Sequence, residues 1–170
     1  ITSGLFSTSE IAIVQARKEI HTFGLRLEKM FSFIQILIDE PKSKKYHKLL
    51  AKIEKHEQIT DNLEMEIATY LTRVSEGEIS HKSSKKIRAM LKMIDDMESI
   101  GDAIYQLSKI IDSSKQNKSQ FLHEQMVSLS EMFEIINEAF LEMNHNLETG
   151  FRDVTFTKAF EIEERINKKR

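Results

Sequence analysis

The stretch LLAKIEKHEQITDNLEMEIATYLTRV, which runs from Leu49 to Val74, decides the fold of this chain. Its stripe residues recur at alternating spacings of four and three, the period of an amphipathic helix that packs in a bundle. The members of this stripe are Leu49, Ile53, His56, Thr60, Leu63, Ile67, Tyr70 and Val74. Beside it, Glu57 and Asp61 are four residues apart, and residues at that spacing lie on one face of a helix. The stretch therefore predicts a long helix with two carboxylates beside its buried face.

Similar stripes on both sides of this stretch predict more helices. The first predicted helix has Ser9 as a candidate N-cap and ends at Asp39-Glu40-Pro41, and its stripe is Ile13, Ala16, Ile20, Phe23, Leu27, Met30, Ile34 and Leu37. The second helix ends at Gly77. The third stripe consists of Ile87, Met90, Ile94, Met97, Gly101, Ile104, Ser108 and Ile111, and the fourth of Leu122, Met126, Leu129, Phe133, Ile136, Phe140, Met143 and Leu147.

The connections between these predicted helices are short. A polar segment from Ser113 to Gln120 follows the third helix, Gly150 ends the fourth, and a fifth starts near Phe156 and continues to Arg170. Five glycines and one proline leave little material for turns. Long helices with short connections pack as antiparallel neighbours, so we expect an all-α fold, an antiparallel up-and-down helical bundle.

The composition indicates one domain, which we place over residues 1–170, and excludes several classes of function. A chain of this length can bury a sizeable core without a second domain. Its 25 basic and 27 acidic residues are well mixed, which excludes the basic surface of a nucleic-acid-binding protein. The absence of cysteine excludes disulfides and thiolate metal sites, and no apolar run reaches the roughly 20 residues that span a bilayer. The ends of the chain read as those of a piece of a longer protein.

An internal repeat organises the predicted helices. A shift of 106 positions places the stripe of the first helix on that of the fourth, so that Leu27 falls on Phe133, for example. The same shift places Glu57 on Glu163 and Asp61 on Asn167. We therefore expect a first three-helix repeat over about residues 10–112 and a partial second repeat over about residues 119–170. The third helix of the second repeat would follow residue 170.

A second carboxylate pair, Glu98 and Asp102, lies in the middle of the third predicted helix. Asp61 is 16 residues before Gly77 and Glu98 is 14 residues after Ser84, so antiparallel packing would place the two pairs at one level. Two like charges about 4 Å apart repel by roughly 4 kcal/mol at an effective dielectric constant near 20. Protonation, basic partners or a metal would offset this repulsion, and oxygen ligands suit hard cations such as Mg²⁺, Mn²⁺ or Ca²⁺, with iron or zinc also possible.

Two further residues, Gly101 and His56, bear on this site. Gly101 lies inside the third helix, where glycine costs about 1 kcal/mol relative to alanine, so we expect another backbone or an ion to approach closely there. His56 lies on the second stripe, where a core position with satisfied hydrogen bonds is more common than a role beside a metal.

Three readings of these acids remain open on the residues alone. The first is a metal site, and the second is a scaffold without metal whose carboxylates are solvated and pair with lysines. The third is a ferritin-like di-iron enzyme, because Glu142 with His145 and Glu78 with His81 have the spacing of di-iron ligands. The enzyme is disfavoured because Glu78 and His81 fall in a predicted turn, whereas Glu142 and His145 fall near the far end of the fourth helix.

The third helix resembles the signature helix of the PhoU family in the segment DMESIGD, from Asp96 to Asp102. The second resembles its partner motif, with Glu57, Thr60, Asp61, Leu63, Glu64, Glu66 and Ile67 in place. Residues 9–20 look like the helix that follows the membrane part of bacterial sodium/phosphate cotransporters with a PhoU-like tail. The resemblance implies helical repeats, no catalytic activity and metal ligation by Glu57, Asp61, Glu98 and Asp102, with Glu163 a weaker candidate.

Departures from the family pattern limit this inference to the first repeat. Ser99 stands where the family often has arginine, Ala103 where histidine is frequent, and Asn167 replaces an acid. The metal implied is a divalent or trivalent ion such as iron, zinc, manganese or magnesium. The expected partners are the membrane transporter portion of the same or an associated protein, with phosphate and a second copy of the chain as further candidates. The implied location is the cytoplasmic side of a bacterial inner membrane.

Overall fold

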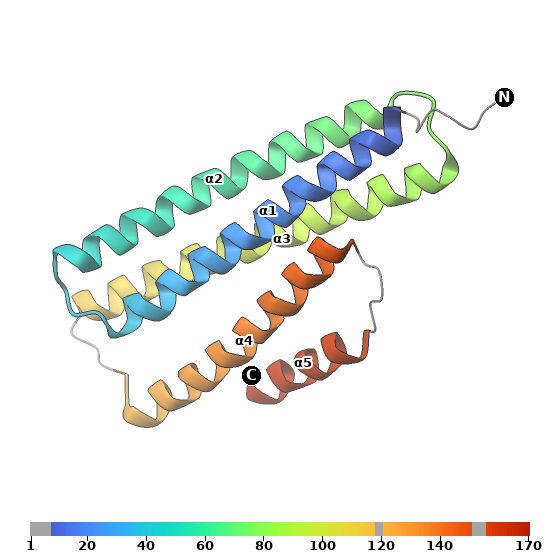
Figure 1. Ribbon diagram of the computed structural model, residues 1–170. Helices are drawn as coiled ribbons and strands as arrows, with labels where there is room; N and C mark the ends of the chain where they lie inside the picture. The colour runs from blue at the N-terminus through green and yellow to red at the C-terminus, as the bar shows by residue number, and fades with distance from the viewer. Residues whose placement is uncertain (1–7, 118–120, 151–155) are drawn as a thin grey trace.

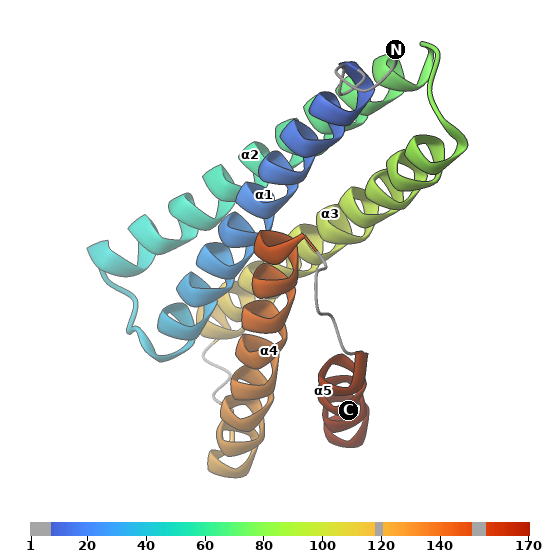
Figure 2. The ribbon, with the colours of Figure 1, turned by 45° about the vertical axis from the view of Figure 1, so that its right-hand side comes forward.

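The computed structural model describes residues 8–117, 121–150 and 156–170, and every regular element in these ranges is an α-helix (Figure 1). The helices are α1 (Thr8–Asp39), α2 (Lys44–Ser75), α3 (His81–Gln116), α4 (His123–Thr149) and α5 (Phe156–Lys169). The first three are long, antiparallel and packed against one another, whereas α4 packs on α1 and α5 packs on α4. Figure 2 shows α4 inclined to the axis of the first three helices. The prediction of an all-α helical bundle is confirmed.

The core lies between α1, α2 and α3, where the apolar stripes of the sequence meet. Every predicted stripe residue of α1 and α3 is buried. The stripe of α2 deviates at its C-terminal end, where Tyr70 is exposed and Leu71 is buried in its place. In α4 the predicted stripe residue Leu122 is exposed, because the helix begins after it and Leu122 is the N-cap position.

Local signals set most helix ends. Ser43 caps α2 by accepting a hydrogen bond from the backbone N–H of Tyr46, and Ser80 caps α3 in the same way from Ser83. Gly150 ends α4 with a φ of 67°, in the left-handed region that glycine adopts without strain. The prediction of Ser9 as the cap of α1 is wrong, because the helix already begins at Thr8.

The C-terminal end of α3 is longer than the sequence predicted. Residues 113–116, predicted as part of a polar connection, continue the helix. Tertiary contacts stabilise this extra turn: Lys115 Nζ donates hydrogen bonds to the backbone carbonyls of Leu37 and Glu40 at the end of α1. One turn earlier, the buried Tyr46 donates its hydroxyl proton to Asp112 over 3.0 Å. The remainder of the predicted connection includes residues 118–120, which lie outside the described ranges.

Different interactions attach α4 and α5. Phe31 of α1 packs on Phe133 and Phe140 of α4, with ring centroids 5.2 and 5.6 Å apart. By contrast, Ile162 is the one buried residue of α5. Ion pairs supply much of the remaining attachment, and they join Arg165 to Glu138, Lys158 to Glu142 and Lys169 to Glu131. Within the described ranges, no helix has the length and apolar character needed to cross a membrane.

Candidate metal site between α2 and α3

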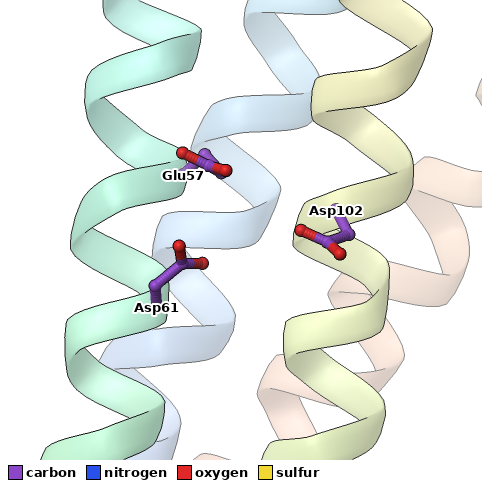
Figure 3. A group of neighbouring side chains, drawn as sticks. All are labelled: Glu57, Asp61 and Asp102. Atoms are coloured by element: carbon purple, nitrogen blue, oxygen red, sulfur yellow. The ribbon is translucent and has the colours of Figure 1, made fainter.

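Three carboxylates meet in the middle of the bundle, at the seam between α2 and α3. Glu57 and Asp61 project from successive turns of α2 toward α3, and Asp102 projects from α3 toward them (Figure 3). One carboxylate oxygen from each residue lies within 4.8 Å of the other two. Glu57 and Asp61 are half-buried and Asp102 is exposed, so the group opens to solvent on the Asp102 side. Three of the four carboxylates that were predicted to lie at one level of the bundle are therefore close together.

The fourth predicted ligand, Glu98, lies beside this group and is not a member of it. It is half-buried on α3, one turn before Asp102. Burial, and then the charges of Asp102, Asp61 and Glu64, raise its pKa. Glu64 belongs to the family motif in the sequence but is not among the predicted ligands. The signal was present, because Glu64 is three residues after Asp61, a spacing that keeps both on one helical face.

The group is electrostatically unfavourable without a counter-ion. Burial, and then the neighbouring charges of Asp61 and Asp102, raise the pKa of Glu57, while Lys109 lowers it. Burial and the charge of Asp102 raise the pKa of Asp61 in the same sense. Among the described residues, the ion pairs within 4.0 Å include none that involves these acids or Glu98. The predicted pairing with lysines, required by the scaffold reading, is absent from that part of the chain.

Gly101 allows α3 to approach α2 and α1 at the level of these carboxylates. It is buried, and a β-carbon built on it would lie 3.3 Å from both Leu27 Cδ2 and Thr60 Oγ1. A close approach is present at Gly101, but side chains make it, so the expectation of another backbone or an ion there is wrong. Thr60 itself is fully buried and donates its hydroxyl proton to the Glu57 carbonyl over 2.7 Å, so this polar position on the stripe is satisfied within its own helix.

His56 does not face the carboxylates. Its ring packs edge-on against Phe33 of α1 with centroids 5.4 Å apart, and its buried Nδ1 has no hydrogen-bond partner among the described residues. The ring thus has a structural place at the α1–α2 seam, and the hydrogen bonds expected of a core histidine are not present at Nδ1 among the described residues. Burial and the charges of four surrounding cations lower the pKa of His56.

The geometry of the three oxygens suits a hard cation. Ligands on opposite sides of Ca²⁺ are about 4.8 Å apart at metal–oxygen distances near 2.4 Å, and about 4.2 Å apart for Mg²⁺ at distances near 2.1 Å. Three oxygens mutually 4.8 Å apart would lie about 2.8 Å from a common centre, so the carboxylates would move inward by a few tenths of an ångström to share one such ion. Three carboxylate ligands would leave further coordination positions to water or to an oxyanion, because these cations take six or more ligands.

The motifs behind the enzyme reading do not join this group. Among the described residues, Glu57, Asp61 and Asp102 form the only set of three or more acids or histidines whose ligand atoms could share an ion. Glu142 instead binds Lys158 and accepts a hydrogen bond from Asn146. Glu78 precedes α3 and His81 begins it. The weaker candidate Glu163 is exposed on α5.

The fold and the site together define an all-helical domain that gathers carboxylates between two neighbouring helices. The sequence model of the PhoU domain matches residues 26–111, just over half of the chain, and the protein belongs to the PhoU family. This family is helical, regulatory and non-enzymatic, and is related to phosphate regulation. No curated protein and no solved structure matches the chain. The matched residues include all of α2, residues 26–39 of α1, most of α3, and all four predicted ligands.

Proposed function

We propose that the protein is a regulatory domain that binds a hard metal cation between α2 and α3 and takes part in the regulation of phosphate transport. The observation that carries the metal proposal is the convergence of three carboxylate oxygens within 4.8 Å of one another, with no ion pair to neutralise them among the described residues. Glu57, Asp61 and Asp102 are the proposed ligands, and Glu98 joins them through a change of side-chain rotamer. The cation is divalent or trivalent, with magnesium, manganese, iron and zinc as candidates.

The transport context rests on the family and on the resemblance of the first helix. In this proposal the chain is the cytoplasmic regulatory domain of a sodium-dependent phosphate transporter, and it acts on the membrane part of the same or an associated protein. The metal holds α2 and α3 together, and its open coordination positions can take phosphate oxygens, since phosphate is a strong ligand for hard cations. A second copy of the chain is a further candidate partner.

Metal addition and one isosteric substitution test the metal site. Without metal, Asp102→Asn removes one of three repelling charges and should raise the midpoint of thermal unfolding. With added Mn²⁺ or Mg²⁺, the wild-type midpoint should rise, because a ligand that binds only the folded state stabilises it. The variant should lose most of this rise. Elemental analysis of protein purified without chelator should find metal in the wild type and less in the variant.

The matched control is Asp96→Asn, on the same helix. Asp96 is exposed and pairs only with Lys92 at the surface. This variant should keep the full response to metal. A wild-type protein that contains no metal and shows no shift with any of these cations would leave the scaffold without metal as the better description.

A further inference from the structure

A cluster of basic side chains lies on the flank of α2 that faces away from the carboxylates, at its seam with α1. We call it the basic cluster and define it as Arg26 and Lys29 of α1 with Lys52, Lys55 and His56 of α2. On α2, each of these residues is 100° or more around the helix from Glu57, given about 100° per residue. The cluster and the candidate metal site therefore use different faces of one helix.

Phe33 lies at the centre of the basic cluster. Lys29 Nζ is 5.7 Å and Lys52 Nζ is 5.4 Å from the centroid of its ring, and the edge-on His56 ring is 5.4 Å away. Phe33 itself is buried, so the lysine side chains extend along apolar surface and present their ammonium groups around it. Groups from two helices thus converge on one small area.

In the described part of the chain, no ion pair neutralises this cluster. Among the described residues, none of the four cations forms an ion pair within 4.0 Å. Two buried nitrogens, Arg26 Nε and His56 Nδ1, have no hydrogen-bond partner in that part of the chain. Buried polar atoms are nearly always paired with protein or with ordered water, so these two nitrogens are positions where a water or a bound molecule could complete a hydrogen bond.

The outer side of the α1–α2 seam is also open. In the described ranges, α4 packs on α1 without contacting α2, and α3 lies against both helices on the side of the core. Lys29, Lys52 and Lys55 are exposed. A small ligand can therefore reach these residues without displacing a helix.

We propose that the basic cluster is a binding site for a phosphate-bearing anion with at least two negative charges. The planar guanidinium of Arg26 can donate paired hydrogen bonds to phosphate oxygens, and the lysines supply compact positive charges around them. One singly charged carboxylate would leave most of the four cations unbalanced. The bound group is either a free phosphate or the phosphate monoester of a lipid headgroup, which share this chemistry. This site needs no metal, so it goes beyond the function proposed above.

The test uses the complete chain in the presence of a chelator, at an ionic strength held constant with chloride. Inorganic phosphate, pyrophosphate, and vesicles of phosphatidylcholine with or without phosphatidic acid are titrated, with calorimetry for the anions and co-sedimentation for the vesicles. If the ligand is free phosphate, we expect saturable binding of phosphate and tighter binding of pyrophosphate. A lipid headgroup as the ligand predicts binding to vesicles that contain phosphatidic acid and not to phosphatidylcholine alone.

Two double variants, each of which removes two positive charges, distinguish binding at this site from general electrostatic attraction to the protein. Lys29→Gln/Lys52→Gln should weaken binding by about tenfold or more. Each substitution removes a hydrogen bond from a charged donor, and such bonds make up a large part of the binding free energy of a small anion. Lys82→Gln/Lys85→Gln removes two exposed charges at the start of α3 and should change affinity by less than about twofold. Both variants should keep the helical circular dichroism of the wild type.

Several results would overturn the proposal. These are an absence of binding to all three probes or an equal loss in both double variants. Phosphate binding that occurs only when the chelator is left out, and that Asp102→Asn abolishes, would assign the phosphate to the metal site instead. Conversely, a protein without metal affinity that still binds phosphate through Lys29 and Lys52 would refute the metal proposal and support this one.

Discussion

Gly101 of α3 lies against Thr60 of α2 so closely that a β-carbon on the glycine would come within 3.3 Å of the threonine hydroxyl. The same β-carbon would be 3.3 Å from Leu27 Cδ2. Both neighbours are buried, and the Thr60 hydroxyl is already bound to the carbonyl of Glu57. This contact therefore links the spacing of the helices to the position of the carboxylates one residue away on each helix.

We expect Gly101→Ala to lower the free energy of unfolding by about 1 kcal/mol. Alanine gains about 1 kcal/mol in helix propensity, but overpacking a filled core costs about 1 to 3 kcal/mol. The stabilisation by Mn²⁺ should shrink as well, because α3 is pushed away from Glu57 and Asp61. Urea unfolding with and without Mn²⁺ measures both effects. The control is Gly77→Ala, where a β-carbon would meet only the Val74 carbonyl at 3.7 Å; equal losses in the two variants would refute this explanation.

The raised pKa of Glu57 predicts a pH dependence of stability in the protein without metal. A carboxyl group whose folded pKa lies above its ordinary value of 4.5 favours the folded state when protonated. The folded state then binds more protons than the unfolded state, so the free energy of unfolding falls as the pH rises from about 4 through the raised pKa. Glu57→Gln should reduce this fall, and urea unfolding over this range with chelator present measures it.

The control for the pH series is Glu66→Gln, since Glu66 is exposed on α2 away from the group. It should leave the pH dependence unchanged. An excess of Mn²⁺ should reverse the trend in the wild type, because protons compete with the metal for the same oxygens and metal binding strengthens as the pH rises. A Glu57→Gln profile parallel to that of the wild type would contradict the assigned repulsion.

At the contact between α1 and α4, Gly24 and Asn144 should be energetically coupled. Asn144 is buried and donates a hydrogen bond to Glu28 over 2.7 Å, and a β-carbon on Gly24 would clash with its Oδ1. Gly24→Ala and Asn144→Ala should each cost about 1 to 3 kcal/mol. The double variant should cost less than their sum, because removal of the Asn144 side chain relieves the clash.

A second cycle with Asn146→Ala controls for this coupling. Asn146 binds Glu142 and makes none of the contacts at Gly24. Gly24→Ala and Asn146→Ala should therefore add within about 0.5 kcal/mol in denaturant unfolding. Equal coupling energies in the two cycles would show that the coupling does not arise from the contact between Gly24 and Asn144.

Lys115→Met should lower the free energy of unfolding by about 1 to 3 kcal/mol. It removes the donor to the carbonyls of Leu37 and Glu40 at the end of α1, and these groups are then left without that partner. Lys92→Met, on the exposed face of the same helix, should cost less than about 0.5 kcal/mol. Chemical denaturation compares the two. A smaller cost for Lys115→Met than for Lys92→Met would show that solvent replaces the ammonium group.

The buried core could be predicted where the stripe of a helix is regular and mostly apolar. The stripes of α1 and α3 are long, regular and apolar, so burial of every member followed from the spacing of three and four. The α2 stripe failed at Tyr70 because a tyrosine can keep its polar end in water while the adjacent Leu71 cannot. The extra turn at the end of α3 depends on contacts from Lys115 and Asp112 to α1 and α2, which local sequence does not contain.

The sequence predicts the position of the candidate site along the bundle, but not which carboxylate oxygens come together there. Helix periodicity and antiparallel packing are enough to bring Glu57, Asp61 and Asp102 together. They do not determine side-chain rotamers, so they could not place Glu98 outside the group. The basic cluster was missed for a related reason, because Arg26 and Lys52 are far apart in the sequence and become neighbours only through the register of α1 on α2.

The attachment of α5 gives the molecule two parts that respond differently to its surroundings. The three-helix core is held by buried apolar surface, which salt strengthens slightly or leaves unchanged. Helix α5 relies on one buried isoleucine and on exposed ion pairs, and dissolved ions screen such pairs. Rising ionic strength therefore loosens the C-terminal helix while the carboxylates between α2 and α3 keep their geometry.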